Sequence, residues 1–470
     1  MTPHPLARIA ALALLALVAV PGRASAQHGG HAGHAAPDTV LAPAPERSPP
    51  ADAAASDDHA QMWMRALGGG WQATGMAQAF PALTAGSVWR DGSLLGPSGA
   101  YLTQPVIMID VGSPDARTVL RTTLDFEAWT QPDGELTFGG WGEGFLDSRH
   151  PHTVLHEAML AANWWDVAGG ALSVSAGKGF APYGTDDPMS RPALKYPTNH
   201  HLSQLLERWT ANAAYLRDGW SVEAGLFAAA EPVDPYDLGN TRGFGESWSA
   251  RLTKRIGGVS ELPTAAPWEL SASVARLNEQ HEDAGARTTL WNAAARHDRR
   301  YGATDVYALL EASRSDPQHG DGYFSILGEG QLTLGARAAH RPYARVEYAT
   351  RPEYEREGPP DTPGFFRYDH DAHAVGATRW LITTVGYGYD VDAGRVSVRP
   401  FAELQHFRVR AERGGIEPAA LYGRDGFWGL SAGARVFFGG GPMRMGAYGA
   451  LDPMAGMLRT PGMAGMHEGH

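Results

Sequence analysis

The chain has 470 residues, a net charge of −12 and no cysteine. The lack of cysteine excludes disulfides, thiolate metal ligands and thiol catalysis, and the negative charge argues against nucleic acid as a partner. Beyond the N-terminus, no stretch reaches the roughly 18 apolar residues that a membrane-spanning helix needs. If the chain crosses a membrane, it must therefore do so as a closed β-sheet.

The first 26 residues have the three parts of a secretory signal. Arg8 ends a short basic region, residues 9–20 are apolar, and Ala24-Ser25-Ala26 forms a cleavage site of small residues. This pattern predicts a signal peptide over residues 1–26. Residues 27–68 are rich in His, Ala and Pro and have no apolar period, so we expect a disordered periplasmic segment there.

Between residues 69 and 438, apolar and polar side chains alternate in short segments separated by Gly, Pro, Asp and Asn. In the last segment, Trp428 and Leu430 face one side and Arg435 faces the other, and the segment ends in Phe437-Phe438. Charges of both signs on the polar face, and aromatic residues near segment ends, are typical of a transmembrane barrel. The predicted fold is therefore all-β, a transmembrane antiparallel up-and-down β-barrel.

The alternating segments predict sixteen strands, with a range of 14 to 18, and an even number places both termini in the periplasm. The expected strands lie near residues 71–80, 101–111, 117–128, 155–165, 171–178, 206–216, 219–229, 245–256, 267–277, 285–296, 302–314, 322–335, 341–351, 374–389, 394–411 and 425–438. Short and long connections mostly alternate. We expect two long ones, residues 129–154 and 179–205, to fold into the lumen, because sixteen strands enclose an aqueous channel unless something fills it.

Charged residues on the polar face of these strands, and in the two inward loops, are the predicted lining of a pore and its constriction. They are Arg121, Asp125, Glu127, Glu143, Asp147, Arg149, Asp186, Asp187, Arg191, Arg251, Arg345, Glu347, Arg399, Glu403 and Arg435.

Histidines and carboxylates are dense in and around the two inward loops. The candidates are His150, His152, His156, Glu157, His200 and His201. Imidazole and carboxylate are common ligands of zinc, copper, iron and nickel, which makes a metal site one interpretation. The other is a hydrogen-bonded plug, in which the same groups cross-link the loops to the wall.

Both ends of the mature chain carry a second set of candidate metal ligands. They are His28, His31 and His34 near the N-terminus, and Met454, Met457, Met463, Met466, His467 and His470 in the C-terminal segment 439–470. This segment is predicted to be a disordered tail rich in Met, His and Gly. Thioether sulfur suits Cu(I) and imidazole suits Cu(II), so copper or another divalent metal is the candidate cofactor. Low-complexity sequence that binds nothing is the alternative.

The sequence contains no set of catalytic residues that we can assign. It lacks the G-x-S-x-G elbow of serine hydrolases, a phosphate-binding loop and a dinucleotide-binding motif. We therefore expect a protein that is not an enzyme.

Three stretches between residues 142 and 208 resemble a segment shared by uncharacterised Gram-negative outer-membrane proteins. They are GEGFLDSRHPHTVLHE, GKGFAPYGTDDPMSRPALKYP and NHHLSQLLER. The resemblance implies a porin-like barrel. The Met/His-rich ends are similar in composition to copper resistance outer-membrane proteins of the copper resistance protein B family.

Two functions follow as expectations. The first is an outer-membrane channel for small polar solutes or ions, constricted by polar loops, in contact with outer-membrane lipid and assembled as a porin-like homotrimer. The second is copper binding, transport or resistance through the Met/His-rich ends.

Overall fold

The computed structural model describes residues 63–86, 89–90, 93–94, 99–130, 135–136, 146–147, 153–185, 188–198, 200–205, 207–229, 232, 235–239, 241–257, 266–279, 286–335, 339–354, 356–357, 367–368, 374–414, 417–419, 424–440, 444–453 and 455. The chain divides into residues 1–54 and 55–470, and every described residue belongs to the second unit. Among the described residues, no helix is long and apolar enough to cross a membrane.

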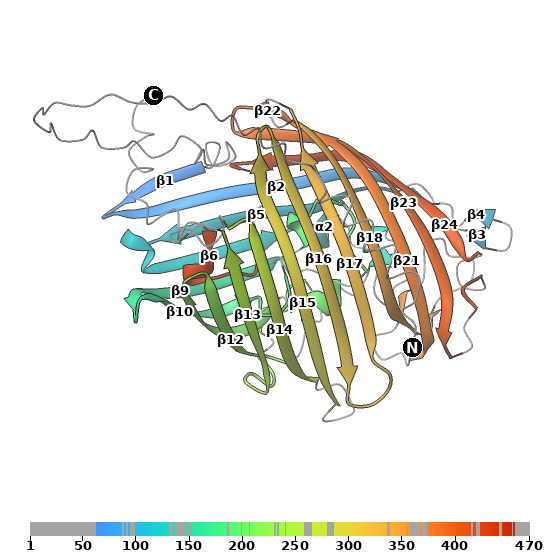
Figure 1. Ribbon diagram of the computed structural model, residues 1–470, viewed down its shortest axis with the longest axis horizontal. Coiled ribbons are helices and arrows are strands. Elements are labelled where there is room, and N and C mark those ends of the chain that lie inside the picture. The colour runs from blue at the N-terminus through green and yellow to red at the C-terminus, as the bar shows by residue number, and fades with distance from the viewer. Residues whose placement is uncertain are drawn as a thin grey trace, which may run out of the picture. The chain divides into compact units, whose positions relative to one another are not determined.

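Sixteen strands of the described chain form one closed antiparallel barrel (Figure 1). They are β2 (Trp71–Gly86), β5 (Gly99–Gly112), β6 (Thr118–Asp125), β9 (Leu155–Val167), β10 (Gly170–Gly179), β11 (Arg208–Arg217), β12 (Trp220–Phe227), β13 (Ser247–Ile256), β14 (Trp268–Glu279), β15 (Ala286–Tyr301), β16 (Thr304–Pro317), β17 (Tyr323–Thr333), β18 (His340–Tyr354), β21 (Ala374–Tyr389), β23 (Val396–Arg413) and β24 (Gly426–Phe438). The predicted fold and strand number are confirmed.

Each strand pairs with the next one in this order, and the last strand returns to the first. The closure pairs Phe438 of β24 with Ala77 of β2, and the other edge of β2 pairs with β5. Closure leaves no unpaired sheet edge in the wall, which is a requirement for a sheet inside a lipid bilayer.

The shorter elements lie in the connections and at the barrel ends. They are β1 (Trp63–Gly68), β3 (Trp89–Arg90), β4 (Ser93–Leu94), η2 (Pro114–Ala116), α2 (Glu127–Thr130), β7 (Glu135–Leu136), β8 (Leu146–Asp147), η3 (Pro188–Ser190), α3 (His200–Ser203), β19 (Arg356–Glu357), β20 (Arg367–Tyr368), β22 (Val391–Ala393) and η5 (Gly449–Leu451).

Two sequence predictions of local structure are wrong. Residues 63–68 were expected to be disordered, yet they form β1, which pairs with the first residues of β2 through a turn at Gly69-Gly70. The strand expected over 117–128 ends at Asp125, because Asp125 Oδ1 accepts the backbone N–H of Glu127 at 2.8 Å and α2 begins there. The β1–β2 pairing and the end of β6 both depend on local hydrogen bonds, which the alternation of apolar and polar residues does not predict.

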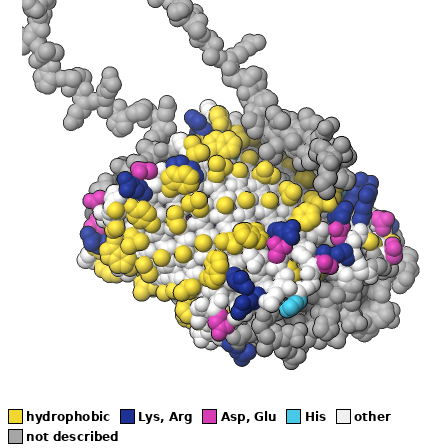
Figure 2. Space-filling model, turned by 60° about the horizontal axis from the view of Figure 1, so that its bottom comes forward, with side chains coloured by type: hydrophobic (Ala, Val, Ile, Leu, Met, Phe, Trp, Pro, Cys, Tyr) yellow, Lys and Arg dark blue, Asp and Glu magenta, His cyan; other side chains and the backbone are white. Residues whose placement is uncertain are grey.

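The outer surface of the wall is apolar. Along β12, exposed Trp220, Val222 and Leu226 alternate with buried Ser221 and Glu223. Figure 2 shows hydrophobic side chains over a wide band of one outer face, with most of the charged side chains at its margins. An apolar outer band on a closed barrel is the surface of a membrane-spanning β-protein.

The two ends of the barrel differ in their connections. Short turns, such as residues 168–169, 218–219 and 302–303, lie at one end, which we call the turn end. The longer connections lie at the other, the loop end. Strand β24 finishes at the turn end, because Phe438 pairs with Val396 immediately after the short β21–β23 connection. The chain therefore leaves the wall at the turn end.

Candidate functional site

The lumen holds residues 180–205, which we call the inner segment. It follows β10 at the loop end and includes η3 and α3. Three wall carboxylates bind the inner segment through hydrogen bonds. Glu311 accepts one from the Thr185 hydroxyl at 2.6 Å. Glu403 and Glu347 each accept one from a backbone N–H, at 2.8 and 2.6 Å respectively. These two N–H groups belong to Leu194 and Thr198. The inner segment therefore crosses toward β16, β18 and β23. This is one of the two connections for which the sequence predicted an inward fold; most of the other, residues 129–154, lies outside the described residues.

Wall arginines complete this attachment. Arg345 donates to the carbonyl of Lys195 at 2.7 Å. Arg435 donates to the carbonyls of Arg191 and Pro192 at 2.9 and 2.6 Å. Arg191 itself reaches Glu311 at 3.2 Å. A guanidinium carries several donors in a fixed plane, so one wall arginine can bind two neighbouring carbonyls of an irregular backbone.

A glycine sets the path of the inner segment at its start. Gly184 has φ of +68°, and a Cβ at this position would lie 1.6 Å from the carbonyl oxygen of Ser203. Its N–H donates to Ser273 of β14 at 2.9 Å. Only glycine combines this left-handed backbone with such a close approach.

A second part of the chain occupies the lumen from the other end. Residues 444–453, which we call the C-terminal segment, re-enter after β24, and their short turn η5 packs beside β9 and β10 (Figure 1). Met445, Tyr448, Leu451 and Asp452 are buried. The prediction of a disordered tail over residues 439–470 is thus wrong for residues 444–453, because the wall supplies partners for their charges and backbone.

Ion pairs and hydrogen bonds fix the C-terminal segment to the wall along its length. Wall donors and acceptors bind it as follows: Glu269 binds Arg444 at 2.7 Å, Arg251 binds the carbonyl of Gly446 at 3.3 Å, Ser173 accepts the N–H of Ala450 at 2.7 Å, and Arg121 binds Asp452 at 2.9 Å. These wall residues belong to β6, β10, β13 and β14.

Tyr448 joins both luminal segments to the wall. Its hydroxyl donates to Glu157 Oε1 of β9 at 2.6 Å and accepts the backbone N–H of Phe180 at 2.9 Å. Burial raises the pKa of the Tyr448 phenol well above its ordinary value, and the charge of Glu157 raises it further. The hydroxyl therefore remains protonated and keeps donating over the neutral and mildly alkaline range.

Each wall group that binds the C-terminal segment also has a partner within the wall. These wall pairs are Arg121 with Asp110 at 2.9 Å, Arg251 with Glu223 at 2.8 Å, Glu269 with Arg255 at 3.0 Å, Glu157 with Thr123 at 2.6 Å, and Ser173 with Asn163 at 2.7 Å. Each of these wall groups would therefore keep one hydrogen-bond or ion-pair partner without the segment.

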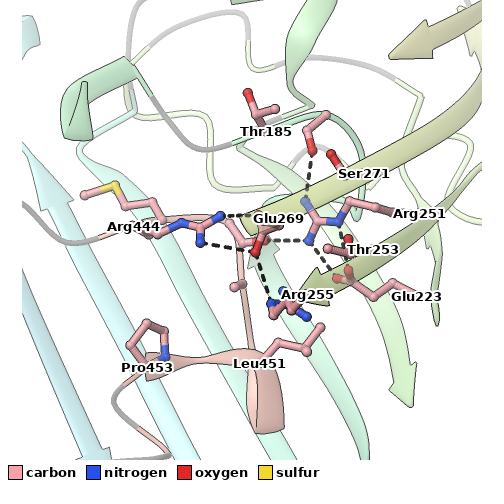
Figure 3. Close-up of a pocket in the computed structure, with 14 residues that line it drawn as sticks. Thr185, Glu223, Arg251, Thr253, Arg255, Glu269, Ser271, Arg444, Leu451 and Pro453 are labelled. Carbon is pink, nitrogen blue, oxygen red and sulfur yellow. Dashed lines mark hydrogen bonds and ion pairs between the residues drawn. The ribbon is translucent and has the colours of Figure 1, made fainter. Parts of the chain in front are cut away.

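A polar pocket lies between the C-terminal segment and the wall (Figure 3). It is small, with a cavity volume of about 40 Å³, and it is partly open to solvent. Arg251, Arg255 and Arg444 converge on it with Glu223 and Glu269, and dashed contacts join Arg444 and Arg255 through the Glu269 carboxylate. A charged lining and this size suit the pocket to ordered water.

Five methionines pack in one buried cluster where the two luminal segments meet. They are Met76, Met108, Met159, Met189 and Met445, together with Val106, Phe180 and Tyr448. Met76 and Met108 are cross-strand partners on β2 and β5. The sequence analysis missed this cluster because its members are scattered over the whole chain. Unbranched methionine suits the irregular gap between two segments and a wall.

Most of the predicted pore residues face the lumen. Buried there are Arg121, Asp125, Glu127, Arg191, Arg345, Glu347, Arg399, Glu403 and Arg435, and Arg251 is half-buried. They form ion pairs and hydrogen bonds, many of them with the two luminal segments. Glu143, Arg149, Asp186 and Asp187 lie outside the described residues, as does the side chain of Asp147.

The predicted histidine cluster is only partly described. His156 Nδ1 lies 2.6 Å from Glu207 Oε1, while His200 Nδ1 lies 2.8 Å from the carbonyl of Pro197. Glu157 binds Thr123 and Tyr448. Within the described ranges, no group of three or more His, Asp or Glu residues is placed to hold a metal ion. The described members thus make hydrogen bonds with neighbouring side chains and backbone, and the choice between a metal site and a plug stays a prediction.

The other candidate ligands lie outside the described residues. They are His28, His31, His34, His150, His152, Met454, Met457, Met463, Met466, His467, His470 and the side chain of His201. Metal binding by these residues stays a prediction.

No protein-family model and no curated protein matches this chain. Among solved structures, it resembles OmpT, an outer membrane protein of Vibrio cholerae, with a TM-score of 0.43 and 10% identity over 78% of this chain and 98% of that one. It also resembles an anion-selective porin from Comamonas acidovorans, with a TM-score of 0.43 and 10% identity over 78% of this chain and 100% of that one. A third similar structure is OprB of Pseudomonas putida, with a TM-score of 0.44 and 12% identity over 77% and 93% of the two chains.

Proposed function

We propose that this chain is a channel of the Gram-negative outer membrane for small polar solutes or ions, and that it is not an enzyme. The observation that carries the proposal is a closed, outwardly apolar barrel whose inner wall bears charges of both signs. A water-filled route lined by such charges passes polar solutes that the lipid excludes.

The inner segment is the constriction in this proposal. It enters the lumen from the loop end and is tied to three wall carboxylates and two wall arginines. A solute must pass between this segment and the paired charges of the wall, so we expect a narrow channel that admits ions more readily than larger solutes.

Conductance in planar lipid bilayers tests the channel. We expect single-channel currents from the full-length protein. A variant that lacks residues 441–470 should give larger currents, because the deletion removes the C-terminal segment from the lumen. If neither protein conducts while both are folded in the same detergent, the channel proposal is rejected.

The second candidate function is the handling of a soft metal ion. The observation in its favour is the cluster of five methionines in the lumen, because thioether sulfur is a preferred ligand of Cu(I). The expected Met/His-rich end of the chain would then collect copper before it reaches the lumen. Copper content after exposure to Cu(I) and washing tests this candidate in the intact protein and in a variant lacking residues 456–470.

A further inference from the structure

The two luminal segments are held in different ways, and the difference bears on how the barrel opens. We propose that the C-terminal segment is a detachable plug, which leaves the lumen at the turn end as a unit while the wall and the inner segment stay folded. As a gate for solutes, the plug rests on the proposed channel function; as a movement of the chain, it does not.

The wall tolerates the departure of the C-terminal segment. Arg121 and Arg251 would keep their carboxylate partners Asp110 and Glu223, and Glu269 would keep Arg255. A buried charge left without a partner is strongly unfavourable, and here each of the three charges remains paired. The penalty that normally holds a buried charged segment in place is therefore small for the wall.

The departing segment carries its own charges into water. Arg444 and Asp452 stand near its two ends, and both would be hydrated outside the lumen. Exchange of a buried ion pair for hydrated ions changes the free energy little, because desolvation offsets much of the Coulomb attraction. What holds the plug is then mainly the packing of Met445, Tyr448 and Leu451.

The connection of the C-terminal segment allows the movement. One covalent link ties it to the wall, at the end of β24, where Gly439 and Gly440 have φ of +78° and +128°. Such angles are accessible mainly to glycine, and two successive glycines make a joint about which the following residues can turn. The inner segment, by contrast, is bonded to β10 at one end and to β11 at the other.

Departure of the plug would open the wall that it now covers. Tyr448 would leave Glu157, and the pocket beside Arg251 and Arg255 would merge with the vacated space. The newly exposed surface carries carboxylates and guanidinium groups from β6, β9, β13 and β14. A path on this side of the lumen would therefore favour small charged or strongly polar solutes.

Thiol labelling tests the movement without reference to conduction. Since the chain has no cysteine, Ala450→Cys and Ala193→Cys each place one thiol in a luminal segment. Both alanines are buried, with 6% and 3% of their surface exposed. With a membrane-impermeant maleimide added to the folded barrel, we expect Ala450→Cys to react at least about tenfold faster than Ala193→Cys. Equal rates would overturn the plug.

A second matched pair guards against a misfolded variant. Leu451 and Leu194 are buried in the C-terminal and inner segments, respectively, so Leu451→Cys and Leu194→Cys repeat the comparison with another residue type. The same order of rates supports the plug, and equal or reversed rates argue against it.

A disulfide that holds the plug against the wall tests whether its movement affects conduction. Ser173→Cys with Ala450→Cys places two thiols where the Ala450 N–H now meets Ser173. We expect the oxidised protein to conduct less than the reduced one, and the variant lacking residues 441–470 to be insensitive to oxidation. Faster labelling of Ala450→Cys with silent bilayers would support the plug and reject the channel. Equal labelling rates of Ala450→Cys and Ala193→Cys, together with a conductance that oxidation of the cysteine pair does not change, would reject the plug and leave the channel proposal standing.

Discussion

The inner segment and the C-terminal segment fill the same lumen, but the wall treats them differently. The inner segment is connected to a wall strand at both ends, and Arg435 donates hydrogen bonds to two of its backbone carbonyls. The C-terminal segment has one covalent connection and meets wall groups that already have partners, as Arg121 does in Asp110. Wall groups that bind the inner segment also have partners within the wall, as Glu403 has in Tyr343 and Arg345 has in Glu329. The two segments therefore differ in their covalent connection, which joins the inner segment to a wall strand at both ends and the C-terminal segment to one wall strand.

The largest expected difference concerns the carboxylates that hold each segment. Glu311→Ala removes an acceptor of Thr185 and Arg191 in the inner segment. The substitution leaves Arg191 the longer contact with Glu329 at 4.0 Å, and breaking a buried pair costs about 3–5 kcal/mol. Asp452→Ala leaves Arg121 paired with Asp110, so we expect a loss of about 1–2 kcal/mol. Thermal unfolding in detergent measures both. Similar losses would contradict the proposed difference between the segments.

Two glycines offer a comparison of backbone strain. Gly184 and Gly449 have φ of +68° and +65°, and a Cβ would lie 1.6 Å from Ser203 O in the first and 2.5 Å from Ser173 Cβ in the second. The left-handed angle alone costs an alanine about 1–2 kcal/mol. We expect Gly184→Ala to lower the unfolding temperature of the barrel, and Gly449→Ala to displace the plug with a smaller effect. A larger temperature drop for Gly449→Ala would show that the plug supports the wall.

The hydroxyl of Tyr448 provides a finer test. Tyr448→Phe leaves Glu157 bonded to Thr123 but removes the acceptor of the Phe180 N–H, a loss of about 0.5–1.5 kcal/mol. In the Ala450→Cys background we expect labelling to become about 3- to 10-fold faster. The control is Tyr183→Phe, since Tyr183 donates to Leu202 within the inner segment. An equal acceleration by the control would point to general loosening of the lumen.

At the methionine cluster we expect a modest effect on stability, and copper content is the second quantity to measure. Met76→Leu with Met108→Leu conserves volume at the register pair of β2 and β5, and swaps of this kind usually cost less than about 1.5 kcal/mol each. If the cluster holds Cu(I), the copper content of the washed protein falls while the unfolding temperature barely moves. Unchanged copper content would assign the methionines to packing alone.

The wall of this protein can be predicted from local sequence patterns. Because lipid lies outside the barrel and a polar lumen inside, apolar and polar side chains alternate along every strand. This alternation can be seen in single segments, such as the one that ends at Phe438. Sixteen strands, their approximate bounds, and the lumen-facing side of residues such as Arg345 and Glu403 follow from it. The hairpin of β1 with β2 was not predicted, because residues 63–68 do not show the alternation of apolar and polar residues that a wall strand needs.

The segments that fill the lumen depend instead on contacts between distant parts of the chain. Residues 444–453 have no apolar period, and their fold depends on partners such as Arg121, which lies 331 positions from Asp452 in the sequence. The methionine cluster likewise draws one member from each of five separate parts of the chain. Contacts between residues so far apart leave no local pattern, so composition predicted a free tail where closure of the barrel creates a binding surface for it.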